Sequence, residues 1–276
     1  MATPTLPETP TLLTSFDDGL LRVTLNRPER RNAMSDEMLV DLQAVMGAVR
    51  DDPAVRIVVL RGAGGIFSAG GDLKNFRTMA GAHQADRAAV IRMNRRFGDL
   101  IEIVDDLRAV LVSVIDRAAL AGGMGLAAAS DVVITEPTAR FSLTETTLGL
   151  VPAQIAPVIA RRIGVVTTRR LAVTAARFDG AEAARLGLVD ILTDELDEAL
   201  DGVIEDVRRC APAANAATKR LINQIGTMPS TDMFDRCAEV FADAMLGQEA
   251  AAGIDSFVNK TPRPWAPGSG QGGGGA

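Results

Sequence analysis

Apolar and polar residues alternate with two different periods along the first half of the chain. Short apolar runs at 11–16 and 20–25 flank Asp17-Asp18-Gly19, a combination typical of a β-hairpin. After Ser35, a residue type that favours the N-cap position, apolar residues recur at helical spacing as far as Met46. The chain is therefore expected to begin with a hairpin followed by an amphipathic helix.

Three later apolar runs, at 56–61, 110–115 and 132–135, are predicted to be buried strands. A helical stripe over 84–107 separates the first two runs, and a short helix ending near Ser130 is expected before the third. Strand and helix thus alternate twice, which predicts right-handed βαβ units and a largely parallel sheet.

From residue 154 onward the pattern is almost entirely helical, and the clearest segments are 195–208, 213–225 and 231–246. We expect an α/β core over 1–200, a helical C-terminal part over 201–263 and a disordered tail over 264–276. The helical part carries apolar pairs that are costly to leave in water, which predicts an interface. These pairs are Leu221-Ile222, Met233-Phe234 and Val240-Phe241. Phe241 and Phe257 are expected to pack between helices.

Composition narrows the class of protein. With 276 residues and 47% hydrophobic content, the chain is long enough to bury one substantial core. A net charge of −6 argues against nucleic acid as the main partner, because phosphate binding needs a basic face. Two cysteines do not suggest a disulfide framework, and neither a targeting peptide nor a membrane-spanning run is visible. We expect a cytoplasmic protein with no membrane partner.

Two glycine-rich breaks, at 67–73 and 119–126, each follow a strand-like run and precede a helix-like run. Such a turn leaves backbone N–H groups free at the positive end of a helix dipole. A carboxylate, Glu145, follows the second break. Two N–H donors that converge on a thioester oxygen would stabilise an enolate, and a nearby glutamate could move the protons.

Other interpretations of these residues remain open. The glycines could mark tight turns and have no catalytic role, and Glu145 could be a surface carboxylate. The run from Gly123 to Ala128 also fits the G-x-G-x-x-A form of a dinucleotide site, but the residues 116–121 separate it from the preceding strand. The single histidine, His83, is expected in a solvated loop. The chain has no His pair and no C-x-x-C spacing, so no metal site is predicted.

Several motifs occur together in one order, and together they resemble the crotonase superfamily, also called the enoyl-CoA hydratase/isomerase family. The motifs are Leu25-Asn26-Arg27-Pro28, Arg31-Asn32-Ala33, the two glycine breaks, the run 145–152, Phe178-Asp179-Gly180-Ala181 and Gly187-Leu188-Val189. The resemblance implies a spiral of ββα turns with a helical C-terminal part that packs in trimers. It also implies that Ala69 and Gly122 supply the two N–H donors and that Glu145 is the catalytic acid–base.

The sequence departs from the resembled hydratases at one catalytic position. A second glutamate is expected three residues after Gly122, and Gly125 stands there. Two branches tolerate this loss: enoyl-CoA isomerases, and hydratases of branched, carboxylated substrates. The run 152–157 (Pro-Ala-Gln-Ile-Ala-Pro) resembles the isohexenylglutaconyl-CoA and methylglutaconyl-CoA hydratases of the second branch. We therefore expect a hydratase, with an isomerase as one alternative and a catalytically weak acyl-CoA-binding protein as another.

The resemblance also implies where coenzyme A, as part of the substrate, would bind. The positions are Arg27, Arg31, Asp72 and Leu73, with Lys219 as a phosphate partner from a neighbouring subunit. No separate cofactor is expected, and the assembly is expected to be a homotrimer or a dimer of trimers.

Overall fold

The computed structural model of the protein describes residues 3–72 and 86–266. Its larger sheet has six strands in the order β1-β2-β3-β4-β6-β9. The strands are β1 Leu12–Asp17, β2 Leu20–Leu25, β3 Ile57–Gly62, β4 Val110–Ile115, β6 Val132–Thr135 and β9 Ile191–Leu192. Only β1 runs antiparallel to its neighbour, which confirms the predicted hairpin and the largely parallel sheet.

A second, three-stranded sheet follows the order β5-β7-β8 and was not predicted. Its strands are β5 Ala118–Leu120, β7 Arg140–Ser142 and β8 Phe178–Asp179. The chain passes from a strand of the large sheet to a strand of the small sheet and then to a helix, twice in succession. The first pass is β4, β5 and α4 (Gly122–Ala129), and the second is β6, β7 and α5 (Ala156–Ile163), with a short 3-10 turn η3 (Glu145–Leu148) between β7 and α5. These are ββα turns, as the resemblance implied.

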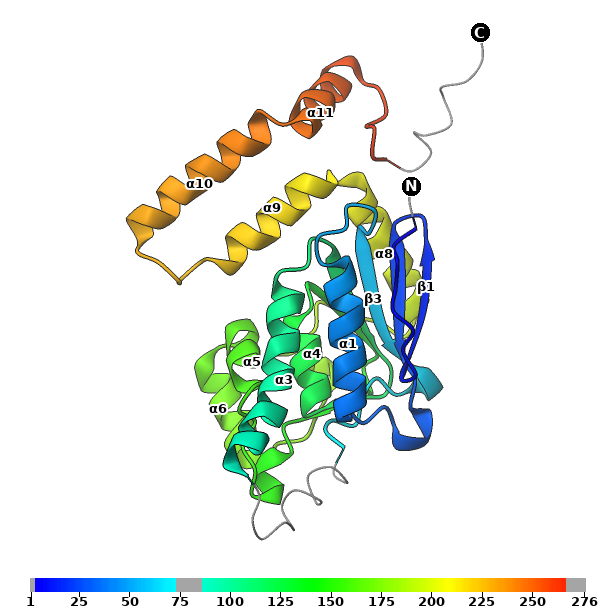
Figure 1. Cartoon of the computed structure of the whole chain (residues 1–276), viewed down its shortest axis with the longest axis vertical. Coiled ribbons are helices and arrows are strands. Elements are labelled where there is room, and N and C mark those ends of the chain that lie inside the picture. The colour runs from blue at the N-terminus through cyan, green and yellow to red at the C-terminus, as the bar shows by residue number, and fades with distance from the viewer. Residues whose placement is uncertain (1–2, 73–85, 267–276) are drawn as a thin grey trace.

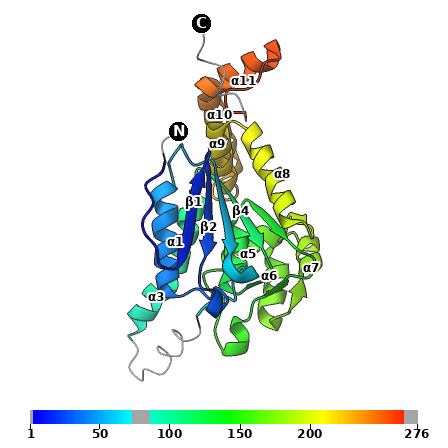
Figure 2. The ribbon, with the colours of Figure 1, turned by 90° about the vertical axis from the view of Figure 1, so that its right-hand side faces the viewer.

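Helices cover both faces of the large sheet. On one face lie α1 (Asp36–Val49) and α3 (Arg87–Asp105), and on the other lies α8 (Leu196–Arg209); Figure 2 shows α1 and α8 on opposite sides of the strands. The Ser35 hydroxyl accepts a hydrogen bond from Met38 N and so caps α1, as predicted. Because both faces are covered, the inner strands β3, β4 and β6 are almost continuously apolar, whereas β1 at the edge alternates.

The remaining elements complete the core. They are the 3-10 turns η1 (Pro28–Arg30) and η2 (Ala63–Gly65) and the helices α6 (Val165–Thr174) and α7 (Gly180–Arg185). A core formed by α1, α3, α4 and α5 fills one side of the sheet, and a smaller cluster built on Leu196, Leu200 and Ile204 of α8 fills the other. Since α8 covers a face of the sheet, the boundary predicted at residue 200 falls inside a core helix.

Three helices lie beyond the core at one end of the molecule (Figure 1): α9 (Pro212–Asn223), α10 (Ser230–Met245) and α11 (Gln248–Asn259). We call them the C-terminal arm. No residue of α10 is buried, and large apolar side chains of the arm are exposed. Phe241 and Phe257 are 71% and 74% exposed, so the expectation that they pack between helices of this chain is wrong. The tail predicted to be disordered lies, from residue 267, outside the described residues.

Candidate active site

The first glycine break forms an extended segment, 68–72, between β5 and the loop 27–34. On one side Ser68 N donates to Ala118 O (3.1 Å), and Ser68 O accepts from Leu120 N (2.9 Å). On the other side Ala69 N donates to Arg31 O (2.9 Å). The segment therefore extends the small sheet by one β-bridge, and it holds the loop against that sheet.

The hydrogen bond from Ala69 to Arg31 corrects an expectation from the sequence. A backbone N–H that already donates within the fold is not available to a thioester oxygen. The interpretation of Ala69 as an oxyanion donor is therefore wrong in this geometry, because its N–H already donates a hydrogen bond to the loop 27–34.

Gly71 is the neighbouring residue whose N–H is well directed. Gly70 O accepts from Met34 N (2.7 Å), and Asp72 N donates to Met34 O (3.0 Å). In a planar trans peptide the N–H points opposite to the preceding C=O. Because Gly70 O points towards Met34, the Gly71 N–H points away from it. Gly70 itself packs against Ala121 beside the second break, since a Cβ built on Gly70 would be 2.7 Å from the Cβ of Ala121.

The second glycine break forms the first turn of α4. Ala121 O accepts from Gly125 N (3.1 Å), so the Gly122 N–H points out of the amino end of the helix, where no described residue bonds to it. Ala121 has φ 47° and ψ −118°, a conformation that disfavours a residue with a side chain. Such strain is characteristic of functional sites. The structure thus places the predicted donor Gly122 at a free helix terminus.

Glu145 lies at the start of η3, three residues after Ser142, whose carbonyl accepts from Ala121 N (2.9 Å). This bond brings the glutamate turn next to the amino end of α4. The Oε2 atom of Glu145 is buried and has no hydrogen-bond partner among the described residues. Burial raises the pKa of the Glu145 carboxyl above its ordinary value, and a bond from its own backbone N–H opposes this shift. A half-buried carboxyl with a raised pKa suits proton transfer.

The position of the absent second glutamate is filled by apolar side chains. A Cβ built on Gly125 would lie 2.5 Å from Ile155 Cγ2 and 3.2 Å from Phe97 Cζ. Phe97 also covers Gly122, at 3.3 Å from a Cβ built there. Ile155 and Phe97 therefore form an apolar wall over the first turn of α4, and that wall leaves no room for a carboxylate at position 125.

The residues proposed to bind coenzyme A do not all come together. Arg27 donates to Asp72 (3.1 Å) and to Ala33 O (2.7 Å), so this pair joins the loop 27–34 to the first glycine break. Arg31 is exposed beside them. Leu73 and His83 lie outside the described residues.

Lys219 is separated from these residues. Its ammonium donates to Asp131 Oδ2 (2.7 Å) and to Ala109 O (3.2 Å), and only 11% of the side chain is exposed. Asp131 also accepts from Leu111 N (2.7 Å) at the amino end of β6. The glycine breaks follow the carboxyl ends of the strands, so Lys219 lies at the opposite end of the sheet, and its charge is already paired there.

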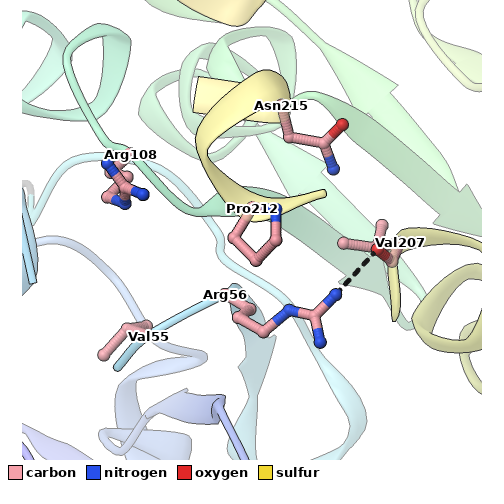
Figure 3. A pocket seen from close by; sticks show the side chains of 6 residues that line it. All are labelled: Val55, Arg56, Arg108, Val207, Pro212 and Asn215. Carbon is pink, nitrogen blue, oxygen red and sulfur yellow. Dashed lines mark hydrogen bonds between the residues drawn. The ribbon is translucent and has the colours of Figure 1, made fainter. Parts of the chain in front are cut away.

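A small cavity at that opposite end is lined by the residues just before β3 and β4 and by the helices α8 and α9 (Figure 3). The lining residues are Val55, Arg56, Arg108, Val207, Pro212 and Asn215. The guanidinium of Arg56 donates to the carbonyls of Val207, Arg208 and Cys210 at the end of α8. The accessible volume is ≈ 10 Å³, about the space that one water molecule needs. The hydrogen bonds of Arg56 hold the junction of α8 with the C-terminal arm. The cavity itself is too small for a substrate.

The described residues carry neither a metal centre nor a membrane-spanning helix. No group of three or more His, Cys, Asp or Glu side chains is arranged to hold a metal ion in residues 3–72 and 86–266. Over the same part of the chain, every helix is too short or too polar to cross a membrane.

Comparison with known proteins identifies the class to which this fold and site belong. Residues 15–268 match the family described as enoyl-CoA hydratase/isomerase, and the chain is a member of that family. Its homologues are named as enzymes, and the α/β fold with a mixed sheet matches their solved structures.

Individual relatives support the same assignment. The structure of Pseudomonas aeruginosa AtuE is 49% identical, with a TM-score of 0.88, and covers 93% of this chain and 99% of its own. An enoyl-CoA hydratase/isomerase from Marinobacter aquaeolei is 39% identical, with a TM-score of 0.88 and coverage of 92% and 98%. The enoyl-CoA hydratase ACTT6 of Alternaria alternata is 30% identical over 245 residues, which are 87% of this chain and 78% of that protein.

Proposed function

We propose that this enzyme adds water across the double bond of an α,β-unsaturated acyl-CoA thioester. The observation that carries the proposal is the direction of two backbone N–H groups, on Gly71 and Gly122, away from the loop and the helix that hold them, together with the buried Oε2 atom of Glu145, which has no hydrogen-bond partner among the described residues. Hydration passes through an enolate, whose charge develops on the thioester oxygen. Preorganised donors at that oxygen stabilise the transition state and are usually the largest contribution to the rate enhancement. Loss of one donor lowers kcat by a factor on the order of 10²–10³.

Glu145 is proposed to carry both proton transfers. The ionised carboxylate takes a proton from water as the water oxygen bonds to C3, and the electron pair of the double bond moves onto the thioester oxygen. When the enolate collapses, the protonated Glu145 returns the proton to C2. Its raised pKa brings the carboxyl closer to the working pH, which favours a group that must act as both base and acid.

The acyl group is proposed to be branched and carboxylated. The support is Gly125 together with the apolar wall of Ile155 and Phe97, which replaces a second acid by hydrocarbon. A wall of this kind can contact an alkyl branch near the reacting carbons. The run 152–157, which contains Ile155, is also the run that resembles hydratases of such substrates.

Glu145→Gln tests the proposal. The variant should lose at least about 10²-fold in kcat, because general acid–base catalysis contributes about that much. Turnover of crotonyl, branched glutaconyl and 3-enoyl thioesters of CoA in heavy-oxygen water then separates the reaction classes. Label in the product supports hydration, and near-normal turnover by the variant would overturn the role of Glu145.

An isomerase is the second candidate, because the same two donors and one glutamate can move a proton between C2 and C4. Migration of the double bond in the 3-enoyl thioester without incorporation of label would establish it. Binding of every thioester in the panel without turnover would instead indicate an acyl-CoA-binding protein.

We further propose that the protein assembles as a trimer or as a pair of stacked trimers through the C-terminal arm. The support is the exposure of large apolar side chains there, including Phe234 (74%) and Phe241 (71%). Phe234→Asp with Phe241→Asp should lower the mass measured by light scattering. Leu13→Asp is the matched control, since Leu13 is also exposed (55%) but lies on the edge strand β1. A wild-type protein that is monomeric at low micromolar concentration would contradict the proposal.

A further inference from the structure

We infer that Asn32 is a positioning residue for catalysis, which sets the direction of the Gly71 N–H through a buried hydrogen-bond network. The inference rests on the proposed oxyanion role of Gly71. Asn32 does not face the substrate side of the segment 68–72. It lies in the loop 27–34 behind that segment and is fully buried, with 0% exposure.

The side-chain amide of Asn32 joins two loops. Its Oδ1 atom accepts from Arg27 N (2.9 Å), and its Nδ2 atom donates to Ala63 O (2.9 Å) and to Ile66 O (2.6 Å). The oxygen and both protons of the amide are thus used. One side chain therefore holds the loop 27–34 against the turn that follows β3.

The backbone around Asn32 holds the first glycine break. Asn32 O accepts from the Ser68 hydroxyl (2.8 Å), and the same hydroxyl oxygen accepts from Gly70 N (3.2 Å). On either side of Asn32, Arg31 O accepts from Ala69 N, and Met34 N donates to Gly70 O. Every peptide from Ser68 to Gly70 is therefore oriented by the loop or by β5. Since Gly70 O fixes the peptide that carries the Gly71 N–H, the loop also fixes this donor.

Asparagine suits this position for two physical reasons. Its backbone is left-handed, with φ 51°, a conformation that asparagine adopts more readily than most residues with a side chain. Its amide also supplies two N–H donors, whereas an aspartate of the same shape would face the carbonyls of Ala63 and Ile66 with none. Within the described part of the chain, no exposed path brings water to these carbonyls at Asn32, because the residue is fully buried.

Loss of the Asn32 network should disturb the direction of the Gly71 N–H while leaving the binding of the acyl chain in place. If the loop 27–34 loosens, the Gly71 N–H turns away from the thioester oxygen, while the contacts of the acyl chain remain. A misplacement of about 1 Å can cost about 10²-fold in rate. We therefore expect kcat to fall by about 10-fold or more and KM to change by less than about 3-fold.

Three variants and a control test the inference in the full-length protein. Asn32→Gly keeps the left-handed backbone but removes the amide, and Asn32→Asp keeps the shape but loses the two donors. Ser68→Ala removes the hydroxyl that links Asn32 to Gly70 and provides a milder variant if the others fold poorly. Ser113→Ala is the matched control, because Ser113 is also fully buried and, within the described part of the chain, its hydroxyl pairs with that of Ser130 alone (2.7 Å).

Two readouts separate positioning from a general loss of stability. The first is the split between kcat and KM at a temperature where each variant is folded. The second is the absorbance of bound cinnamoyl-CoA, a conjugated thioester whose spectrum moves to longer wavelength when hydrogen bonds polarise its carbonyl. We expect the shift to shrink in Asn32→Gly, Asn32→Asp and Ser68→Ala, and to stay unchanged in Ser113→Ala.

The outcomes are distinguishable from those of the proposed function. If no thioester is hydrated but the spectral shift is present and depends on Asn32, the proposed reaction fails and the positioning role stands. If Asn32→Asp and Ser68→Ala keep the wild-type spectrum and kcat, the inference is overturned, whatever the reaction.

Discussion

The two glycine breaks direct N–H groups by different physical means. The first break, 68–72, is an extended segment held on both sides by backbone and side-chain hydrogen bonds, several of them from the loop 27–34. The second break is a helix terminus whose N–H groups are free because a helix cannot satisfy its own first turn. It is held by packing, with Phe97 and Ile155 against the glycines of α4.

The difference predicts which substitutions disturb the direction of each N–H donor. An extended segment has no intrinsic direction for a single N–H, so its neighbours must set that direction, and polar substitutions in those neighbours should damage it. A helix terminus has a built-in direction, so polar neighbours matter less, and added volume around it should matter more. The following predictions test this contrast, from the largest expected effect to the smallest.

Gly125→Glu should damage the second break most. The new Cβ would meet Ile155 Cγ2 at 2.5 Å, so α4 or Ile155 must shift. We expect a loss of about 1–3 kcal/mol in the free energy of unfolding from overpacking, and at least about 10²-fold in kcat/KM because the Gly122 N–H moves with α4. Denaturant unfolding and turnover of the preferred thioester measure the two effects.

Ile155→Ala in the same chain provides the control for this clash. Added to Gly125→Glu, it should restore much of the lost stability, whereas alone it should destabilise by leaving a cavity. Purely additive changes in the two variants would show that Ile155 does not occupy the place of the second carboxylate.

Arg27→Ala should damage the first break through its polar neighbours. The side chain donates to Asp72 and to Ala33 O in a half-buried site, so we expect a loss of about 2–3 kcal/mol in the free energy of unfolding and a fall in kcat. Arg31→Ala is the comparison, because Arg31 is exposed; if it contacts a CoA phosphate, its removal should raise KM with little change in stability. An Arg27→Ala variant with normal stability and a raised KM would instead place Arg27 on the substrate.

Glu145→Gln should change the pH dependence of stability. Because burial raises the folded-state pKa of Glu145 above its ordinary value of 4.5, the protonated form stabilises the fold, and that contribution is lost as the pH rises through the folded-state pKa. Glutamine has no such titration. The variant should therefore match the wild type in Tm near pH 4 and exceed it slightly near pH 7. An equal difference at both pH values would contradict the shifted pKa.

Ala121→Gly should have the smallest effect and tests the strain at the second break. Relief of the left-handed φ of 47° stabilises the fold, while the greater freedom of glycine in the unfolded chain opposes it by about 0.4–1 kcal/mol. We expect a net change within about 1 kcal/mol, with kcat unchanged because helix α4 still directs the Gly122 N–H. A large fall in kcat would mean that the Ala121 side chain, packed on Gly70, holds the two breaks in register.

Much of the fold could be predicted from local pattern. The hairpin, the N-cap of α1, the strands β4 and β6 and most helices of the second half follow from periodicity and turn residues, because these features depend on neighbours in the chain. The short strands β5, β7 and β8 were not predicted. Segments of two or three residues have no period, and they become strands only by pairing with one another.

The sequence by itself determined the family, the position of Glu145 in its motif and the glycine that opens α4, since a helix terminus is directed by its own backbone. Only the tertiary structure decided that Ala69 is bonded to Arg31 and that Gly71 is turned the other way. In an extended segment, successive N–H groups point to opposite sides, so those of Ala69 and Gly71, two positions apart, would point the same way. The left-handed φ of Gly70 (93°) reverses the direction between them, and the hydrogen bonds of the loop 27–34 hold that conformation. The tertiary structure also decided that Ile155, thirty positions after Gly125 in the chain, fills the space of the absent acid.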